Sequence, residues 1–202
     1  MGSEMCIRDR VFGRVKSRAF RVVWLLEELE IPYDLTEIAP RSEEAKKVYK
    51  NGKIPFVLDD DVLISDSVAI LTYLSDKHKS FTEEAGSIER AKQDSITFRI
   101  LDEFEALIWV AAKHSYVFSD EKKVPDIINV LKWEFANNQE KFITEFPLRK
   151  NVCGEKFLIP DILLGHCLVW AESMNFSICE ELIEYSNRLK ERPAYQKAYA
   201  LR

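Results

Sequence analysis

The sequence predicts an α/β domain over residues 1–78, a linker over residues 79–87 and an all-helical domain over residues 88–202. Strand and helix patterns alternate in the first part, whereas only helical periodicity remains after the polar stretch near residue 80. The chain has 202 residues, of which 47% are hydrophobic and 31% are charged. It is therefore long enough to bury a core without disulfide or metal support.

The first part of the chain shows a regular alternation of elements. Val22, Leu25 and Leu29 repeat at helical spacing, and the Ile31-Pro32 pair ends that helix. Two apolar runs around the acidic turn 59–61 are typical of a β-hairpin. The predicted order is strand, helix, strand, helix, hairpin, helix, with the elements near residues 11–12, 20–30, 33–38, 42–49, 56–64 and 67–74.

Residues 1–10 fit poorly with this pattern. Asp9 and Arg10 stand where a buried opening strand is expected, and only Val11 and Phe12 have strand character. We interpret residues 1–10 as a leader that is not native to the fold, and we expect the first strand to be incomplete.

The second part of the chain carries helical periodicity only. Pro125 lies near a helix start, where its missing N–H costs nothing, and Pro193 begins a last turn. The predicted helices cover residues 88–116, 124–146, 161–173 and 178–189.

Charge and composition exclude several classes of function. The net charge of −5 is unsuited to nucleic acid, which needs a basic face. No apolar run reaches the roughly 18 residues of a membrane span, and no signal peptide is recognisable. Four scattered cysteines favour reduced thiols in a cytoplasmic protein, and the three histidines are too far apart in the sequence to indicate a metal site.

Three segments carry a resemblance to a known family. They are SRAFRVVWLLEEL with the following IPY (residues 17–29 and 31–33), NGKIPFVL with LISDSVAI (51–58 and 63–70), and FLIPDILL (157–164). In this order, with the change from α/β to all-α, the chain resembles the cytosolic glutathione transferases, in particular their Ser-type microbial and fungal branch with an S-R-x-x-R first helix. The resemblance implies a thioredoxin-like N-terminal domain followed by a helical bundle.

The second of these segments resembles the family's glutathione-binding half-site. The resemblance implies a cis Ile54-Pro55 bond that exposes the Ile54 backbone to the peptide, although Pro55 could also be an ordinary turn proline. Ser67 would then hold the γ-glutamyl carboxylate and Asp66 its ammonium, in addition to capping a helix. Lys53 would meet the glycine carboxylate, unless it is simply a solvated lysine.

The chemistry of such a site requires a thiolate. A free thiol has a pKa near 8.5, and lowering it by about two units takes about 2.7 kcal/mol. One hydroxyl donor supplies roughly 1.5–3 kcal/mol. The family's tyrosine position falls on Phe12, which has no hydroxyl, and its serine position falls on Lys16, one residue before Ser17. The resemblance therefore implies Ser17 as the catalytic donor, a role that is compatible with capping the helix. The basic residues Arg14, Lys16, Arg18 and Arg21 would favour an anion, with Arg18 predicted to contact glutathione, or would form a solvated face.

The helical domain is expected to hold the electrophile. Trp109, His114 and Tyr116 lie late in its first long helix, where the family lines a hydrophobic cleft, although such residues are more often part of a core. Leu158 replaces the Ser or Thr that the family usually has three residues before Asp161. Asp161 must therefore find other donors, and the cap should be weaker by about 1 kcal/mol.

The resemblance implies an activity, and two other classes of function remain as alternatives. The expected reaction joins the glutathione thiolate, as co-substrate, to small hydrophobic electrophiles in detoxification, or reduces a peroxide. A homodimer in the cytoplasm is implied, with no metal, nucleic acid or membrane as partner. The alternatives are a non-catalytic binding or assembly module of the same fold, and a thiol–disulfide enzyme, which would need a low-pKa cysteine at the first helix where the chain has Ser17.

Overall fold

The structure, a computed structural model, describes residues 9–202 and divides them into two units. The first unit holds the residues up to Ser80 together with residues 191–202, and the second holds Phe81–Lys190. The sequence alone assigns residues 191–202 to the helical domain, whereas their contacts place them with the first unit.

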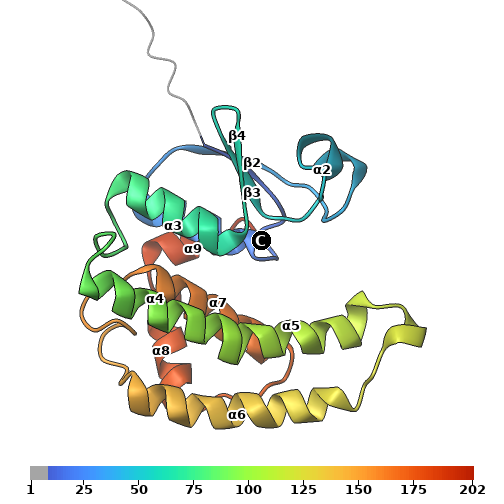
Figure 1. Ribbon diagram of the computed structural model, residues 1–202, viewed down its shortest axis with the longest axis vertical. Coiled ribbons are helices and arrows are strands. Elements are labelled where there is room, and N and C mark those ends of the chain that lie inside the picture. Colours follow the sequence, from blue (N-terminus) through green and yellow to red (C-terminus); the bar gives the residue numbers. More distant parts are fainter. Residues whose placement is uncertain (1–8) are drawn as a thin grey trace, which may run out of the picture. The chain divides into compact units, whose positions relative to one another are not determined.

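The first unit contains the β-sheet that is seen beside α2 and α3 in Figure 1. The sheet has four strands in the order β2-β1-β3-β4. β1 pairs in parallel with β2 and antiparallel with β3, with Val11 opposite both Leu35 and Val57. β3 and β4 form the predicted hairpin. The strands are β1 (Asp9–Phe12), β2 (Tyr33–Thr36), β3 (Phe56–Asp59) and β4 (Val62–Ser65).

The expectation of an incomplete first strand is wrong for Asp9 and Arg10. Both belong to β1, which is an inner strand of the sheet. Asp9 is buried at the start of the strand, where burial raises its pKa, and its carboxylate lies 3.7 Å from the Lys77 ammonium. Arg10 extends to the hairpin turn and donates to the Asp60 carbonyl at 3.1 Å. Polar partners therefore allow two charged residues in a central strand; residues 1–8 of the proposed leader, Cys6 included, lie outside the described residues.

Alternation along the strands gives the sheet two buried faces. The Phe12 and Phe56 rings stack at 4.7 Å on one face, where they join the cluster of Ile38 and Ala45 beside α2. Val11 and Val57 point to the other face, which α1 and α3 cover. The three helices are α1 (Ala19–Leu29), α2 (Glu43–Val48) and α3 (Ser67–His78), and the predicted Ser42 cap of α2 accepts the Ala45 N–H at 3.1 Å.

The short helix α9 (Pro193–Tyr199) packs on α1. Tyr195 meets the Trp24 ring edge to face at 4.9 Å. The Arg192 guanidinium forms two bonds of 2.6 and 2.7 Å with the Glu28 carboxylate, which also accepts the Trp24 indole N–H at 2.9 Å. The residues around α9 therefore cover the acidic side of α1, and most of the helix is buried.

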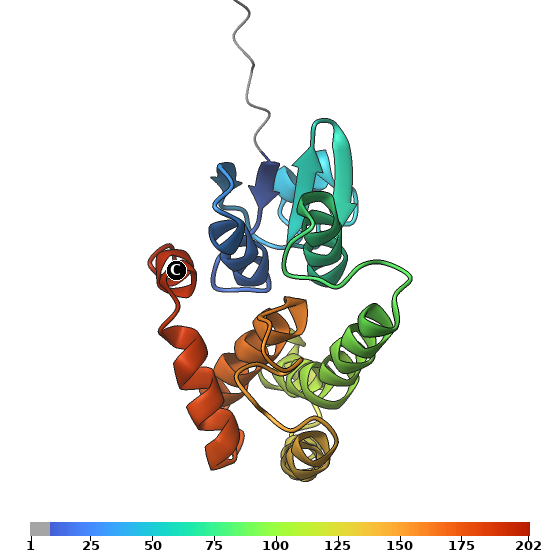
Figure 2. The same cartoon turned by 90° about the vertical axis from the view of Figure 1, so that its left-hand side faces the viewer.

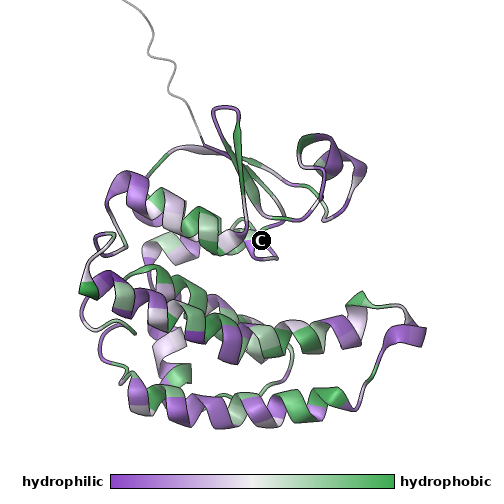
Figure 3. Ribbon diagram, in the orientation of Figure 1, coloured by the Kyte–Doolittle hydropathy of each residue, from purple (hydrophilic) through white to green (hydrophobic). Residues whose placement is uncertain are grey.

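The second unit is helical, as predicted. The predicted helix 88–116 is one helical run, in which the π-helical segment η1 interrupts the α geometry and a second one, η2, ends the run. α7 carries apolar residues along its length and lies between α4 and α8 (Figures 2 and 3). Within residues 9–202, no helix combines the length and apolarity needed to cross a membrane. The elements are α4 (Ile88–Ile100), η1 (Leu101–Glu105), α5 (Ala106–Ala112), η2 (Lys113–Val117), η3 (Asp120–Lys122), α6 (Ile127–Glu145), α7 (Ile159–Ser173) and α8 (Glu180–Lys190).

Candidate functional site

The first turn of α3 is the candidate anion site of the first unit. Asp66 is exposed and caps the helix: its carboxylate accepts the N–H groups of Val68 at 2.9 Å and of Ala69 at 3.2 Å. Asp66 has φ +76° and ψ 128°, a conformation that costs a residue with a side chain of order 1–3 kcal/mol. Ser67, at the first helical position, is only 2% exposed. Backbone strain at a helix N-terminus is typical of a binding site.

A buried arginine lies behind this helix start. Arg21 of α1 is fully buried, and its Nη1 donates to the Ser67 Oγ at 3.2 Å. Arg21 belongs to the basic run of the sequence, but its burial was not predicted. The signal was present, because the apolar residues from Val22 to Leu26 fill all sides of α1 and leave no solvent face beside Arg21.

The loop before β3 and the turn after β1 lie against each other. The Ile54-Pro55 peptide bond is cis, as predicted. Gly13 has φ +153°, and a Cβ added to it would lie 3.6 Å from the Pro55 Cα and only 2.9 Å from the Ala19 Cβ. Only glycine fits this approach, which brings the segment leading to Ser17 next to the Ile54-Pro55 loop.

The predicted thiolate donor, Ser17, precedes α1 and is half-buried. Its hydroxyl donates to the Arg14 carbonyl at 2.6 Å and accepts the Ala19 N–H at 3.2 Å. The residue at the cap position itself is Arg18, whose side chain makes no capping bond. Rotation of the Ser17 hydroxyl would redirect its proton while its oxygen continues to accept the Ala19 N–H. To donate to a ligand, the hydroxyl must therefore give up its bond to the Arg14 carbonyl.

The remaining predicted glutathione contacts differ in their surroundings. Lys53 is exposed, Ile54 is half-buried against the Phe56 cluster, and Pro55 is buried. Arg18 is half-buried at the start of α1. All of these residues belong to the first unit, together with Ser17, Asp66 and Ser67.

The three predicted electrophile contacts belong to the second unit. Trp109 is half-buried, with the Trp170 ring at 6.2 Å and the Lys113 ammonium 6.0 Å from its centroid. The His114 Nδ1 accepts the Val124 N–H at 3.1 Å, which holds the ring in place. Tyr116 is 62% exposed. Trp109 therefore takes part in ring packing, and His114 in a hydrogen bond to the backbone.

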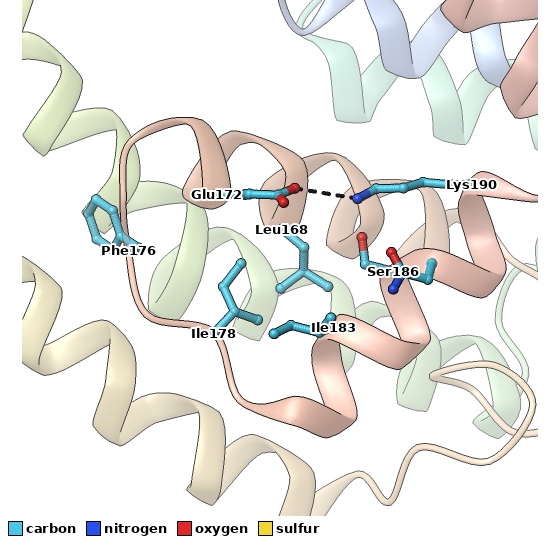
Figure 4. Close-up of a pocket in the computed structure, with 8 residues that line it drawn as sticks. Leu168, Glu172, Phe176, Ile178, Ile183, Ser186 and Lys190 are labelled. Carbon is cyan, nitrogen blue, oxygen red and sulfur yellow. Dashed lines mark hydrogen bonds and ion pairs between the residues drawn. The ribbon is translucent and has the colours of Figure 1, made fainter.

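The helical unit contains a cavity of about 160 Å³ between α7 and α8 (Figure 4). Leu168, Ile178 and Ile183 form its apolar lining, and the ion pair of Lys190 with Glu172, at 3.4 Å, lies across its edge. None of the predicted electrophile contacts lines this cavity.

Asp161 at the start of α7 has other hydrogen-bond donors in place of the hydroxyl that Leu158 lacks. The fully buried carboxylate accepts the N–H groups of Leu158 and Val152, each at 2.8 Å, and the Tyr185 hydroxyl. Burial and the Asp161 charge raise the pKa of Tyr185 well above its usual range. Burial, followed by the same charge, raises the pKa of the Cys153 thiol to about 12, so this thiol is protonated at neutral pH.

Within the described part of the chain, thiols and metal ligands are dispersed. Cys153, Cys167 and Cys179 form no disulfide with one another. No group of three or more His, Cys, Asp or Glu side chains in residues 9–202 is arranged to hold a metal ion. His166 lies near the Trp170 ring, at 6.1 Å, on the apolar helix α7.

The fold is a thioredoxin-like α/β unit followed in the chain by a helical unit, and known proteins share this fold. Residues 17–77 match the family of the glutathione S-transferase N-terminal domain. The chain is 27% identical over 160 residues to glutathione S-transferase GstA of Escherichia coli O157:H7, which covers 75% of this chain and 74% of that protein. It is 35% identical over 82 residues to glutathione S-transferase 3 of Schizosaccharomyces pombe, a match that covers 37% of this chain and only 34% of the length of that protein.

A solved structure matches the fold over nearly the whole chain. It is the theta class glutathione S-transferase of Xanthomonas axonopodis pv. citri with glutathione bound, at a TM-score of 0.79, 20% identity, and coverage of 94% of this chain and 96% of that one. Residues 17–77 thus match the N-terminal domain of the glutathione S-transferases, and the chain as a whole has the fold of that solved structure.

Proposed function

We propose that the protein binds glutathione in its first unit and transfers the glutathione thiolate to hydrophobic electrophiles, or uses it to reduce peroxides. The observation that carries this proposal is the start of α3, where the nearly buried Ser67 follows the strained Asp66 and bonds to the guanidinium of Arg21. A helix N-terminus with a cation behind it favours a carboxylate. The related theta class structure, which contains glutathione, supports the choice of ligand.

The two charges of the γ-glutamyl group fit the two polar residues at this helix start. Ser67 supplies a hydroxyl and the first N–H of the helix for the carboxylate, while the exposed Asp66 carboxylate offers a partner for the ammonium. Lys53, exposed next to the Ile54-Pro55 loop, would meet the glycine carboxylate of the tripeptide, and the Ile54 backbone would pair with the extended peptide.

Ser17 is proposed as the donor to the thiolate. In the ligand-free protein its hydroxyl bonds to the Arg14 carbonyl, so donation to the sulfur requires an exchange of acceptors. A charged sulfur is the stronger acceptor, and a hydrogen bond to a charged group contributes roughly 1.5–3 kcal/mol. The thiolate then attacks an electrophilic carbon, and the leaving group departs with the electron pair of the broken bond.

The electrophile site is proposed to include Trp109, His114 and Tyr116 of the second unit. We also propose that the protein acts as a homodimer in the cytoplasm, as the family resemblance implies. Light scattering of the purified chain at several concentrations tests the dimer, and a monomer at all of them would contradict it.

The test of the proposed function is glutathione binding and turnover by the full chain. Calorimetry should show glutathione binding, and an activated aryl halide should be conjugated faster than in buffer with glutathione alone. Binding without turnover of any electrophile or peroxide would favour the non-catalytic alternative, and absence of binding would contradict both.

Ser17→Ala separates the catalytic role of the hydroxyl from a helix-cap role. We expect the pKa of the bound thiol to rise while glutathione affinity changes little; a loss of about 2 kcal/mol slows conjugation at pH 7 roughly thirtyfold. The deficit should shrink as the pH rises past the unassisted thiol pKa. Ser42→Ala, which removes the equivalent hydroxyl from α2, is the matched control and should leave the pH–rate profile unchanged. A Ser17→Ala profile that overlays the wild type would assign the thiolate to the arginines and the helix dipole.

A further inference from the structure

Arg21 is the one residue of the basic run whose side chain is fully buried while it also contacts the candidate site. Its guanidinium carries a positive charge, because an arginine side chain is too weak an acid to lose its proton in a protein. Removing such a charge from water is costly, so a buried arginine is kept where its donors have defined acceptors. One of these acceptors is the Ser67 Oγ, at 3.2 Å from Nη1.

This contact decides which way the Ser67 hydroxyl can act. A serine hydroxyl has one proton to donate and two lone pairs to accept with. Because guanidinium has donors only, Arg21 occupies a lone pair of the Ser67 Oγ and leaves the Ser67 proton to be donated elsewhere. Donation to a negatively charged acceptor is favoured further, since the fixed cation polarises the hydroxyl.

The neighbouring carboxylate is held away from this arrangement. Asp66 directs its Oδ1 to the N–H groups of Val68 and Ala69 on its own helix. The start of α3 therefore presents three features to a ligand: the Ser67 proton, the helix N-terminus and, one hydroxyl behind them, a positive charge.

We propose that Arg21 is a positioning residue that makes Ser67 a selective donor to a carboxylate, so that the site distinguishes the γ-glutamyl carboxylate of glutathione from an uncharged group of the same shape. This inference rests on the proposed function. The competing explanation is a purely structural tie between α1 and α3, which would weaken all ligands alike when it is removed.

The experiment compares two probes on the full chain. Calorimetry is run with glutathione and with its analogue in which the γ-glutamyl carboxylate is a carboxamide. The wild-type protein should prefer glutathione at least tenfold. Arg21→Met, which keeps much of the side-chain length without the charge, should lose at least tenfold in affinity for glutathione while its affinity for the carboxamide changes by less than twofold.

Two further variants test whether Arg21 acts through Ser67. Ser67→Ala should lose the same preference for the carboxylate, and the double variant Arg21→Met/Ser67→Ala should be no weaker than the worse single variant. Lys47→Met removes one positive charge from an exposed position of α2, outside the site, and is the matched control, with less than a twofold effect expected. In steady-state assays, Arg21→Met should raise KM for glutathione and leave kcat at saturation nearly unchanged.

The possible outcomes are distinct. An Arg21→Met protein that keeps the wild-type preference, or weakens both probes equally, overturns the inference and leaves the proposed function standing. Fully additive losses in the double variant overturn it as well. Failure of the wild type to bind glutathione overturns the proposed function and this inference with it. If Arg21→Met does not fold, Arg21→Lys and Ser67→Ala decide: the lysine must retain part of the preference and the alanine must lose it, and the opposite pattern overturns the inference.

Discussion

The first turns of α3 and α7 each contain an aspartate that accepts backbone N–H groups, but the two carboxylates have opposite surroundings. Asp66 of α3 is exposed, accepts two N–H groups of its own helix, and is followed by a serine that contacts a buried cation. Asp161 of α7 is fully buried and accepts two N–H groups and the Tyr185 hydroxyl.

This difference separates a structural helix start from one that can bind a ligand. At α7 the acceptors are satisfied by the chain itself and no solvent reaches them, so the carboxylate stabilises the fold. At α3 the strained Asp66 is exposed, and Ser67 beside it is bonded to the buried Arg21 guanidinium, so this helix start is open to a ligand. Substitutions at the first site should change stability, and those at the second should change affinity.

The largest expected effect is on the stability of the α7 start. Asp161→Ala leaves the Leu158 and Val152 N–H groups and the Tyr185 hydroxyl without their acceptor, at about 1–3 kcal/mol for each buried group left unpaired. We expect the free energy of unfolding to fall by about 4 kcal/mol in urea titrations followed by circular dichroism. A loss under about 1 kcal/mol would mean that water replaces the carboxylate and that the two helix starts are less different than they look.

The next effect is on affinity at the α3 start. Ser67→Ala should weaken glutathione binding by roughly 1.5–3 kcal/mol, the contribution of a hydrogen bond to a charged group. Its free energy of unfolding should fall by less than that of Asp161→Ala. Calorimetry that finds equal affinity in the wild type and the variant would remove Ser67 from the glutathione site.

Tyr185→Phe tests the buried cluster by its pH dependence. The variant loses one hydrogen bond to a charged acceptor, so we expect it to be less stable at pH 7 by about 1.5 kcal/mol. Because the pKa of Tyr185 is raised in the folded state, only the unfolded chain releases this proton just above pH 10, and the wild type must lose stability as the pH rises past about 10. The variant should lose stability less steeply there; parallel curves from pH 8 to 11 would show that Tyr185 does not contribute.

The smallest expected effect separates the two roles of Asp66. Asp66→Asn keeps an oxygen that can accept the Val68 and Ala69 N–H groups, so unfolding should change little. The contact to the ligand ammonium loses its charge, and glutathione affinity should fall two- to fivefold, about 0.5–1 kcal/mol. An unchanged affinity would mean that Asp66 only caps the helix and does not bind the ligand ammonium.

Most of the elements of both units follow from local signals in the sequence. The hairpin around residues 59–61, the Ser42 cap and the helix after Asp66 are encoded by neighbouring residues, and the structure confirms them. The family resemblance supplied the cis Ile54-Pro55 bond, which a propensity argument would not have given.

The errors concern contacts between residues far apart in the chain. Asp9 and Arg10 read as poor strand residues because their partners, Lys77 and Asp60, are distant in sequence. Arg21 read as one member of a basic run for the same reason. The roles assigned to Ser17, Lys53 and Trp109 depend on a bound ligand and stay predictions.

Residues 191–202 complete the first unit from the far end of the chain, with Tyr195 and Arg192 covering α1. During synthesis the ribosome therefore makes every residue of the helical unit before it makes the helix that covers α1. Until residues 191–202 are synthesised, the Trp24 ring and the Glu28 carboxylate of the first unit lack the segment that covers them. The helical unit already has its whole sequence at that stage. The second unit to be synthesised is thus the first that can finish folding.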